Sequence, residues 1–207
     1  LFDGNISLYN PMLLDSMYIL ANCNQLYCDH WLLQDLLAQL NIESITLPQP
    51  IKNLEKIHYS GDIKGKLNNL QIHGAFTTAL GAICVNGKIQ SDTNLQNIDF
   101  IGDIATERFQ LGKLLDHNDL GDIALNTHIN GSIDSTIVTH CIAEANIKNI
   151  AYKGYTYQNI HLDGEWNQNE INGALSINDK NIQLDISGLA DWDKNDTRID
   201  IKIGIDH

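Results

Sequence analysis

The chain has 207 residues, of which 43% are hydrophobic, and a formal net charge of −13 at pH 7. This length fits one large all-β domain or two smaller ones, and the hydrophobic content is sufficient for a packed core. Only 13 basic residues stand against 26 acidic ones. The composition excludes a nucleic-acid partner, which needs clustered Lys and Arg to bind phosphates, and the sequence shows no basic cluster suited to an anionic membrane surface.

The chain begins at Leu1 without a Met, a secretory signal or an apolar run of about 18 residues that could span a bilayer. We therefore expect a soluble piece, which fits a segment cut from a longer protein. Its four cysteines, Cys23, Cys28, Cys84 and Cys141, are too few and too widely spaced for a disulfide framework or a zinc site. Their disulfide state stays open. On a regular strand Cys23 and Cys28 point to opposite faces, and Cys141 has the parity of the apolar face.

Residues 1–56 are predicted to form two strands, a covering helix and a proline-containing loop. The strands are separated at Asn10-Pro11. Asp29 is a suitable N-cap, and leucines at helical spacing follow it, so a helix over about 30–40 should lay this stripe on the sheet. The stripe consists of Leu32, Leu33, Leu36, Leu37 and Leu40. Pro48 and Pro50 then indicate a loop, because neither fits a central strand.

Residues 57–207 show period-two alternation of apolar and polar side chains, which predicts an antiparallel meander with one apolar face. One interruption, 109–116, predicts a short helical turn. Glycines recur on the apolar parity near the middle of successive strands, where they mark bends or close backbone approach. The predicted fold is all-β, an elongated and strongly curved antiparallel sheet that forms a gutter with an apolar interior.

The turns allow a test of register. A two-residue turn at Gln168-Asn169 places Trp166 opposite Ile171 and Gly164 opposite Gly173, so that apolar residues meet on one face. The same argument at Asp179-Lys180 pairs Ile177 with Ile182. A turn at 134–136 places His140 opposite Asn130.

Several glycine and aromatic motifs resemble the TamB family, the AsmA-like translocation and assembly module, in its Bacteroidetes-type members. They are Tyr59-x-Gly61-x-x-x-Gly65, Gly74-x-Phe76-x-Thr78 before Gly81, Phe109-x-Leu111-Gly112, Gly154-Tyr155-x-Tyr157-x-Asn159-Ile160, and Asp179-x-Asn181 with Gly188. The similarity spans about residues 26–203. It implies an internal fragment of a periplasmic protein, anchored in the inner membrane, that conducts phospholipid between the membranes and supports outer-membrane biogenesis.

The apolar residues on this parity suit acyl chains, because aliphatic side chains and glycine make no directional demand on a ligand. The predicted partners are a phospholipid or another acyl-chain ligand and, for the full-length protein, an outer-membrane assembly partner. The predicted lipid-groove residues are Ile72, Gly74, Phe76, Val85, Gly87, Phe100, Gly102, Ile104, Leu125, Ile129, Gly131, Leu162, Gly164, Trp166, Gly173, Leu175, Leu184, Gly188 and Ile201.

Two other functions remain open at this point: a self-contained carrier of a lipid or other apolar ligand, and a structural β repeat of a surface adhesin with a filled, dry core. We expect no enzyme, no cofactor and no metal. No nucleophile elbow or phosphate-binding loop occurs. His73, His128, His140 and His161 have polar-face parity, where an exposed histidine is a simpler interpretation than a two-histidine metal site.

Overall fold

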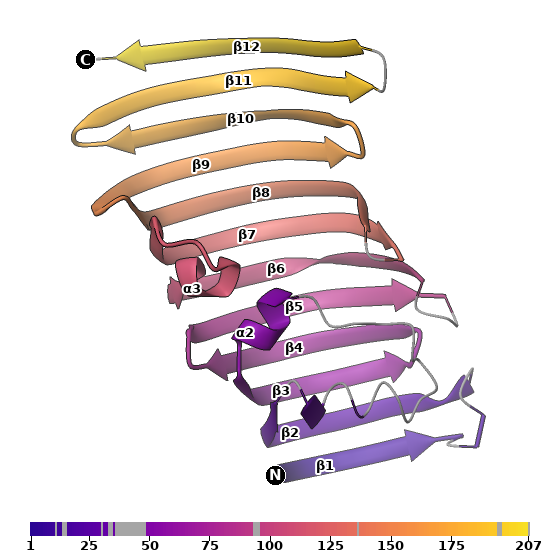
Figure 1. Cartoon of the computed structure of the whole chain (residues 1–207). Helices are drawn as coiled ribbons and strands as arrows, with labels where there is room; N and C mark the ends of the chain where they lie inside the picture. Colours follow the sequence, from indigo (N-terminus) through magenta and orange to yellow (C-terminus); the bar gives the residue numbers. More distant parts are fainter. Residues whose placement is uncertain are drawn as a thin grey trace.

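The protein folds as one open antiparallel sheet of twelve strands. The structure is a computed structural model, and it describes residues 1–10, 12–13, 16–29, 31–32, 35, 49–92, 96–135, 137–193 and 196–206. Each strand pairs with its neighbours in the chain, so the spatial order is the sequence order (Figure 1). Within the described ranges β1 and β12 have one pairing partner each, and the sheet does not close. The predicted all-β fold and its curled antiparallel sheet are confirmed.

The strands are long, and all twelve exceed the usual five or six residues. Their bounds are β1 Phe2–Tyr9, β2 Tyr18–Asp29, β3 Lys56–Lys66, β4 Asn69–Thr78, β5 Gly81–Ser91, β6 Asn97–Gln110, β7 Leu120–Asp134, β8 Ile137–Tyr152, β9 Tyr155–Asn167, β10 Glu170–Asp179, β11 Ile182–Asp193 and β12 Asp196–Asp206. Since neighbouring strands lie about 4.8 Å apart, the sheet is about 50 Å long across its strands.

Two short helices, α2 (Gln49–Asn53) and α3 (Leu111–Leu115), lie together over one end of the strands (Figure 1). The Asn53 amide joins them by donating hydrogen bonds to the carbonyl oxygens of Lys113 (3.3 Å) and Leu114 (2.9 Å). The helical turn predicted over 109–116 is confirmed as α3. Pro50 does not lie in a loop, because it occupies the first turn of α2, where its missing N–H breaks no helical hydrogen bond.

The predicted helix after residue 29 lies largely outside the described residues. At its start, the Asp29 carboxylate accepts a hydrogen bond from the Leu32 N–H at 2.9 Å, as an N-cap does. Trp31 and Leu32 are helical and exposed.

The register predicted for β9 and β10 is confirmed, with Trp166 opposite Ile171 and Gly164 opposite Gly173. The register predicted for β10 and β11 is wrong by two residues, because Ile177 lies opposite Leu184 instead of Ile182. Asp179 causes the difference. Its side chain accepts a hydrogen bond from the Asn181 N–H at 3.0 Å, which moves the turn to residues 180–181. A shift of two residues keeps the apolar parity and adds Gly188 opposite Gly173.

Bulges account for two further corrections. Between β7 and β8, Asp134 pairs with Ile137, so the turn is one residue shorter than predicted. Together with a bulge at Ser132/Ile133, this places His140 opposite Ser132 instead of Asn130. Another bulge, between β2 and β3, reverses the parity of β2 after Cys23, so that Cys28 faces the same side as Cys23. Cys23 lies opposite Gly61 and Cys28 opposite Ile57, about 13 Å apart along the strand, which is too far for a disulfide.

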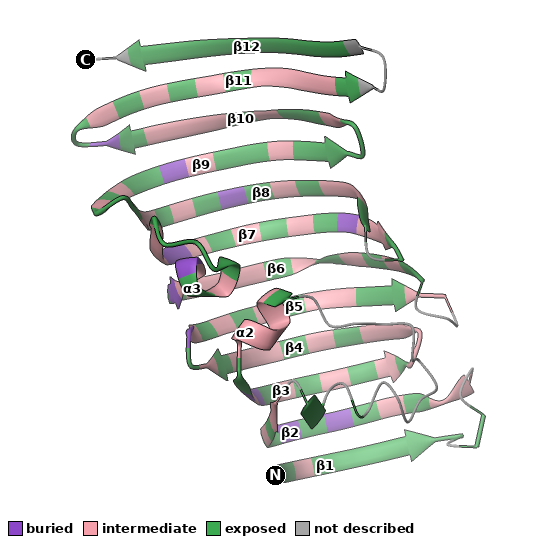
Figure 2. Cartoon of the chain, viewed as in Figure 1, coloured by how far each residue is buried: buried purple, intermediate pink, exposed green. Residues whose placement is uncertain are grey.

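Two small clusters of buried residues lie on the apolar face. Most of the remaining sheet is intermediate or exposed (Figure 2). The first cluster is Ala21, Cys23 and Tyr59. The second is Leu80, Phe109 and Ile123, with Leu54 after α2 and Leu111 and Leu114 of α3 packed against it. The short helices therefore close one side of the apolar face.

Candidate functional site

The register brings every predicted groove residue onto one face of the sheet. Directly opposed pairs show this from strand to strand, for example Val85 with Ile104 and Leu162 with Leu175. At the two edges the same face carries Ile6 and Leu8 on β1 and Ile199 to Ile205 on β12. The apolar face is thus continuous across all twelve strands.

Small residues line up across the strands in the middle of this face. We call this register line the small-residue row: Gly87, Gly102, Ile129, Ala143, Gly164, Gly173 and Gly188. One flanking line contains Val85, Ile104, Thr127, Ala145, Leu162, Leu175 and Ile186, and the other contains Ile89, Phe100, Gly131, Cys141, Trp166, Ile171 and Ala190. Mostly larger side chains therefore border a low central track. Ile129 interrupts this track on β7, where its neighbours in the flanking lines are Thr127 and Gly131.

An apolar cavity of about 240 Å³ occupies the C-terminal part of this track. Gly164, Gly173 and Gly188 are in its wall, beside Leu162, Leu175, Ile171, Ile186, Ala190 and Ile201. A methyl group placed on Gly164 would meet only the Asn172 carbonyl oxygen, at 3.7 Å. Among the described residues no side chain comes within 4 Å of this methyl position, so the cavity is a depression of the apolar face.

Two other glycines on the face, Gly74 and Gly131, are covered by aromatic rings. A Cβ on Gly74 would lie 2.8 Å from Tyr59 Cε2, and one on Gly131 would lie 2.7 Å from Phe100 Cζ. Tyr59 is only 2% exposed, and its hydroxyl donates hydrogen bonds to the carbonyl oxygens of Asp62 (2.9 Å) and His73 (3.2 Å). Burial raises the pKa of Tyr59 to about 12. At Gly74 and Gly131, an aromatic ring from a neighbouring strand therefore fills the space that a side chain would occupy.

Gly61 shows why this motif requires glycine. Its φ of +150° lies in a region that residues with a Cβ rarely adopt. Its Cα also lies directly opposite Gly74, where two backbones approach closely. Tyr59 then packs over both glycines, so the Tyr59-x-Gly61 spacing has a structural cause.

Among the predicted groove residues, an open group and a packed group can be distinguished. Leu162, Gly164, Gly173, Leu175, Gly188 and Ile201 line the cavity. Ile72 and Phe76 instead pack on the Tyr59 cluster, and Leu125 packs on the Phe109 cluster. Sequence reasoning missed Ala143, Ile171, Ile186 and Ala190 as site residues. Their parity was visible in the alternation, but their closeness to the glycines depends on the register.

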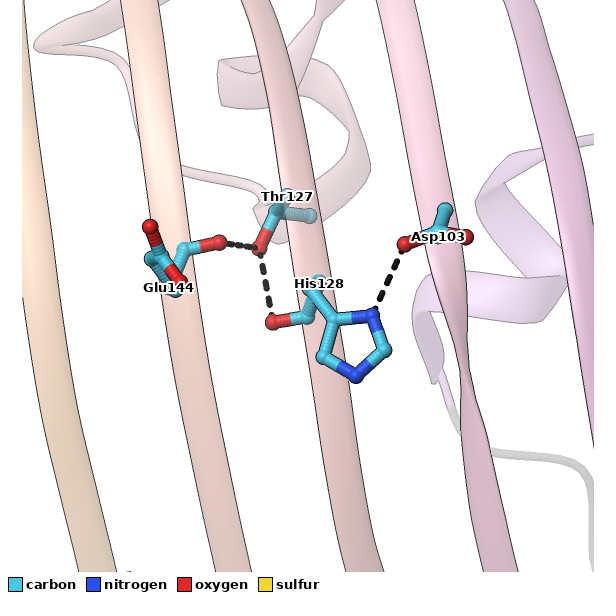
Figure 3. A network of polar contacts seen from close by, with 4 residues as sticks. All are labelled: Asp103, Thr127, His128 and Glu144. Carbon is cyan, nitrogen blue, oxygen red and sulfur yellow. Dashed lines mark hydrogen bonds and ion pairs between the residues drawn. The ribbon is translucent and has the colours of Figure 1, made fainter.

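Thr127 is a polar residue in a flanking line, and its hydroxyl is paired with the backbone. It donates to the Glu144 carbonyl oxygen at 2.9 Å and lies 3.4 Å from that of His128 (Figure 3). The apolar character of the face is therefore maintained across β7.

The four histidines of polar-face parity lie on the opposite face, among carboxylates and amides. His128 Nδ1 lies 2.8 Å from Asp103 Oδ1 (Figure 3), and His161 Nδ1 lies 3.0 Å from Asn146 Oδ1. His140 Nδ1 lies 3.8 Å from Glu165 Oε1. Within the described ranges no three His, Cys, Asp or Glu side chains are grouped as a metal site would require.

Two hollows larger than the apolar cavity lie on this polar face. One of about 620 Å³ contains Asp163, Glu165, Arg198 and Asp200, and another of about 590 Å³ contains Asp62, Lys88 and His128. Glycines of the small-residue row form part of both walls. Their lining mixes both signs of charge, which does not suit an acyl chain.

The four cysteine thiols are free. Cys141 lies on the apolar face opposite Gly131, as predicted, and Cys84 lies on the polar face opposite Ala75. Burial raises the pKa of the Cys23, Cys28 and Cys141 thiols. These three are therefore poor nucleophiles at neutral pH.

No family model, curated protein or solved structure matches the chain. Among the described residues, no helix has the length and apolar character needed to cross a membrane.

Proposed function

We propose that the apolar face holds and conducts acyl chains, as a non-enzymatic segment of a TamB-like bridge that carries phospholipid through the periplasm and supports outer-membrane biogenesis. The observation that carries this proposal is the continuous apolar face with an unfilled cavity on its low central track. Burial of an acyl chain there yields about 0.8 kcal/mol per methylene and requires no polar partner.

The two alternative functions fit the geometry less well. A self-contained carrier encloses its ligand, whereas this sheet is open at β1 and β12. A structural repeat with a dry core fills its apolar face, whereas Leu162, Trp166 and Ile171 are 36%, 42% and 40% exposed. The TamB-like role, the anchor, the outer-membrane partner and the periplasmic location derive from the resemblance of the glycine and aromatic motifs.

Ile129 provides the sharpest test, because it is the one large side chain between Gly87 and Gly188 in the small-residue row. We expect Ile129→Asp to block lipid passage, since a carboxylate in an apolar track is costly to desolvate. Asn126→Asp is the matched control, because Asn126 lies on the polar face of the same strand and is exposed.

The readout is transfer of fluorescent phospholipid between donor and acceptor vesicles, with far-UV circular dichroism to verify that both variants fold. Equal transfer by Ile129→Asp, Asn126→Asp and the parent protein would show that lipid does not use this face. In a second assay, phospholipid with brominated chains should quench Trp166 and Trp192, whose rings lie 6.0 Å apart. Trp166 lies opposite Ile171, which is in the cavity wall. Trp31→Phe removes the remaining tryptophan signal.

A further inference from the structure

Three lysines gather on the polar face of β3–β5, although the protein has a net charge of −13. Lys64 lies opposite Gln71, which in turn lies opposite Lys88. Lys66 lies opposite both Tyr18 and Asn69. Over β2–β5, these two neighbouring register lines contain cationic, amide, hydroxyl and apolar side chains and no carboxylate. We call this set the lysine patch: Tyr18, Lys64, Lys66, Asn69, Gln71 and Lys88.

The patch surrounds a hollow. A depression of about 260 Å³ is lined by Tyr18, Lys64, Gly65, Lys66, Asn69 and Gln71, with no carboxylate in its wall. Lys88 borders the adjoining hollow, which shares Lys64 and Gln71 with it. Because strands lie about 4.8 Å apart, Lys64 and Lys88 are about 10 Å apart at the backbone, and both ammonium groups can reach an anion above Gln71.

The charges of the patch are not neutralised by close partners. Within the described ranges none of the three lysines has an ion pair within 4.0 Å. Two carboxylates, Asp62 and Asp103, line the adjoining hollow with Lys88. Asp62 accepts a hydrogen bond from the Asn22 amide at 2.6 Å, and Asp103 Oδ1 lies 2.8 Å from His128 Nδ1.

We propose that the lysine patch binds a phosphate group, on the face of the sheet opposite the lipid groove. Lysine is a common point-charge ligand of phosphate, and the amides of Asn69 and Gln71 add neutral donors beside it. The hollow has room for one compact anion. The acidic remainder of the surface repels a long polyanion, so a single phosphate group fits better than a nucleic acid. Free phosphate and a phospholipid headgroup share this chemistry.

The first arm of the test is a titration of the purified protein with inorganic phosphate at constant ionic strength, followed by amide chemical shifts. We expect saturable shifts that are confined to Gly65, Asn69 and their neighbours. The triple variant K64Q/K66Q/K88Q should lose at least about tenfold in affinity, because it removes every charge-assisted contact. The control K113Q/K153Q/K180Q has the same net charge but changes lysines of α3 and of the β8–β9 and β10–β11 turns. Its affinity should stay within about twofold of the parent protein.

The second arm identifies the source of the phosphate. Flotation with phosphatidylcholine vesicles, with and without phosphatidylglycerol, tests the headgroup, and the phosphate titration tests the free ion. Loss of vesicle binding in the patch variant alone supports a headgroup ligand. Absence of both saturable shifts and vesicle binding, or equal losses in patch and control variants, overturns the proposal. Neither result depends on lipid transfer through the apolar groove.

Discussion

At the scale of single residues, the glycines of the small-residue row have different roles although they share one face and one line. Gly164 faces open space, whereas a Cβ on Gly188 would collide with the Asp200 carbonyl oxygen and lie 2.8 Å from Ile201 Cα. The first position tolerates a side chain, and the second is occupied by the neighbouring strand.

We therefore predict that Gly164→Ala leaves stability unchanged or raises it by up to about 1 kcal/mol, because alanine reduces the entropy of the unfolded chain. Gly188→Ala should cost about 1–3 kcal/mol, since β12 must move to admit the methyl group. Urea unfolding of the two variants measures both values. Equal destabilisation at the two sites would mean that the cavity above Gly164 is filled in solution.

At the scale of elements, the turn between β10 and β11 depends on one carboxylate. Asp179 is 3% exposed and accepts hydrogen bonds from the Tyr155 hydroxyl (2.5 Å), the Asn181 N–H (3.0 Å) and the Gln158 N–H (3.1 Å). The Tyr155 hydroxyl and then the Asn181 N–H lower the pKa of Asp179 below its ordinary value of 3.8. The ionised form is therefore the one that the fold stabilises.

A folded-state pKa below the unfolded one gives stability that is present above about pH 4 and is lost as the pH falls through the folded value. We expect the unfolding free energy of the parent protein to fall from pH 6 to pH 3 more steeply than that of Asp179→Asn, which has no proton to gain at this site. Urea unfolding at both pH values provides the comparison, with Asp185→Asn on the exposed face as the control. Parallel pH profiles would contradict the role assigned to the carboxylate.

The same turn shows the limit of sequence reasoning. Alternation predicted the strands and the apolar face, because parity depends only on local spacing. It could not predict that Asp179 would bond to Asn181 and move the turn, nor that bulges would rotate Cys28 and shift His140. The groove residues were thus predicted by face, but the division into the open Gly164 region and the packed Tyr59 region required the register.

At the scale of the whole molecule, the apolar face ends in an uncovered edge strand. Ile199, Ile201, Ile203 and Ile205 of β12 are between 53% and 64% exposed, beside backbone groups that β11 does not pair. Such an edge favours pairing with other chains.

We predict that the 207-residue chain associates in solution in a concentration-dependent way, and that Ile203→Lys lowers this association by placing a charge on the edge. Light scattering after size-exclusion chromatography gives the mass at each concentration. Asp200→Asn changes the net charge by the same amount on the polar side of β12 and should not lower it. An unchanged mass for Ile203→Lys would exclude association through this face.

The strand order has a consequence for how the protein is made. Because each strand pairs with the one just before it, every hairpin can dock as soon as it is synthesised, without waiting for a distant part of the chain. The sheet can grow from one end by about 4.8 Å per strand, in the way that repeat proteins propagate their structure. A protein of this topology can thus lengthen or shorten by whole hairpins during evolution. The length of the sheet across its strands is then set by the number of hairpins.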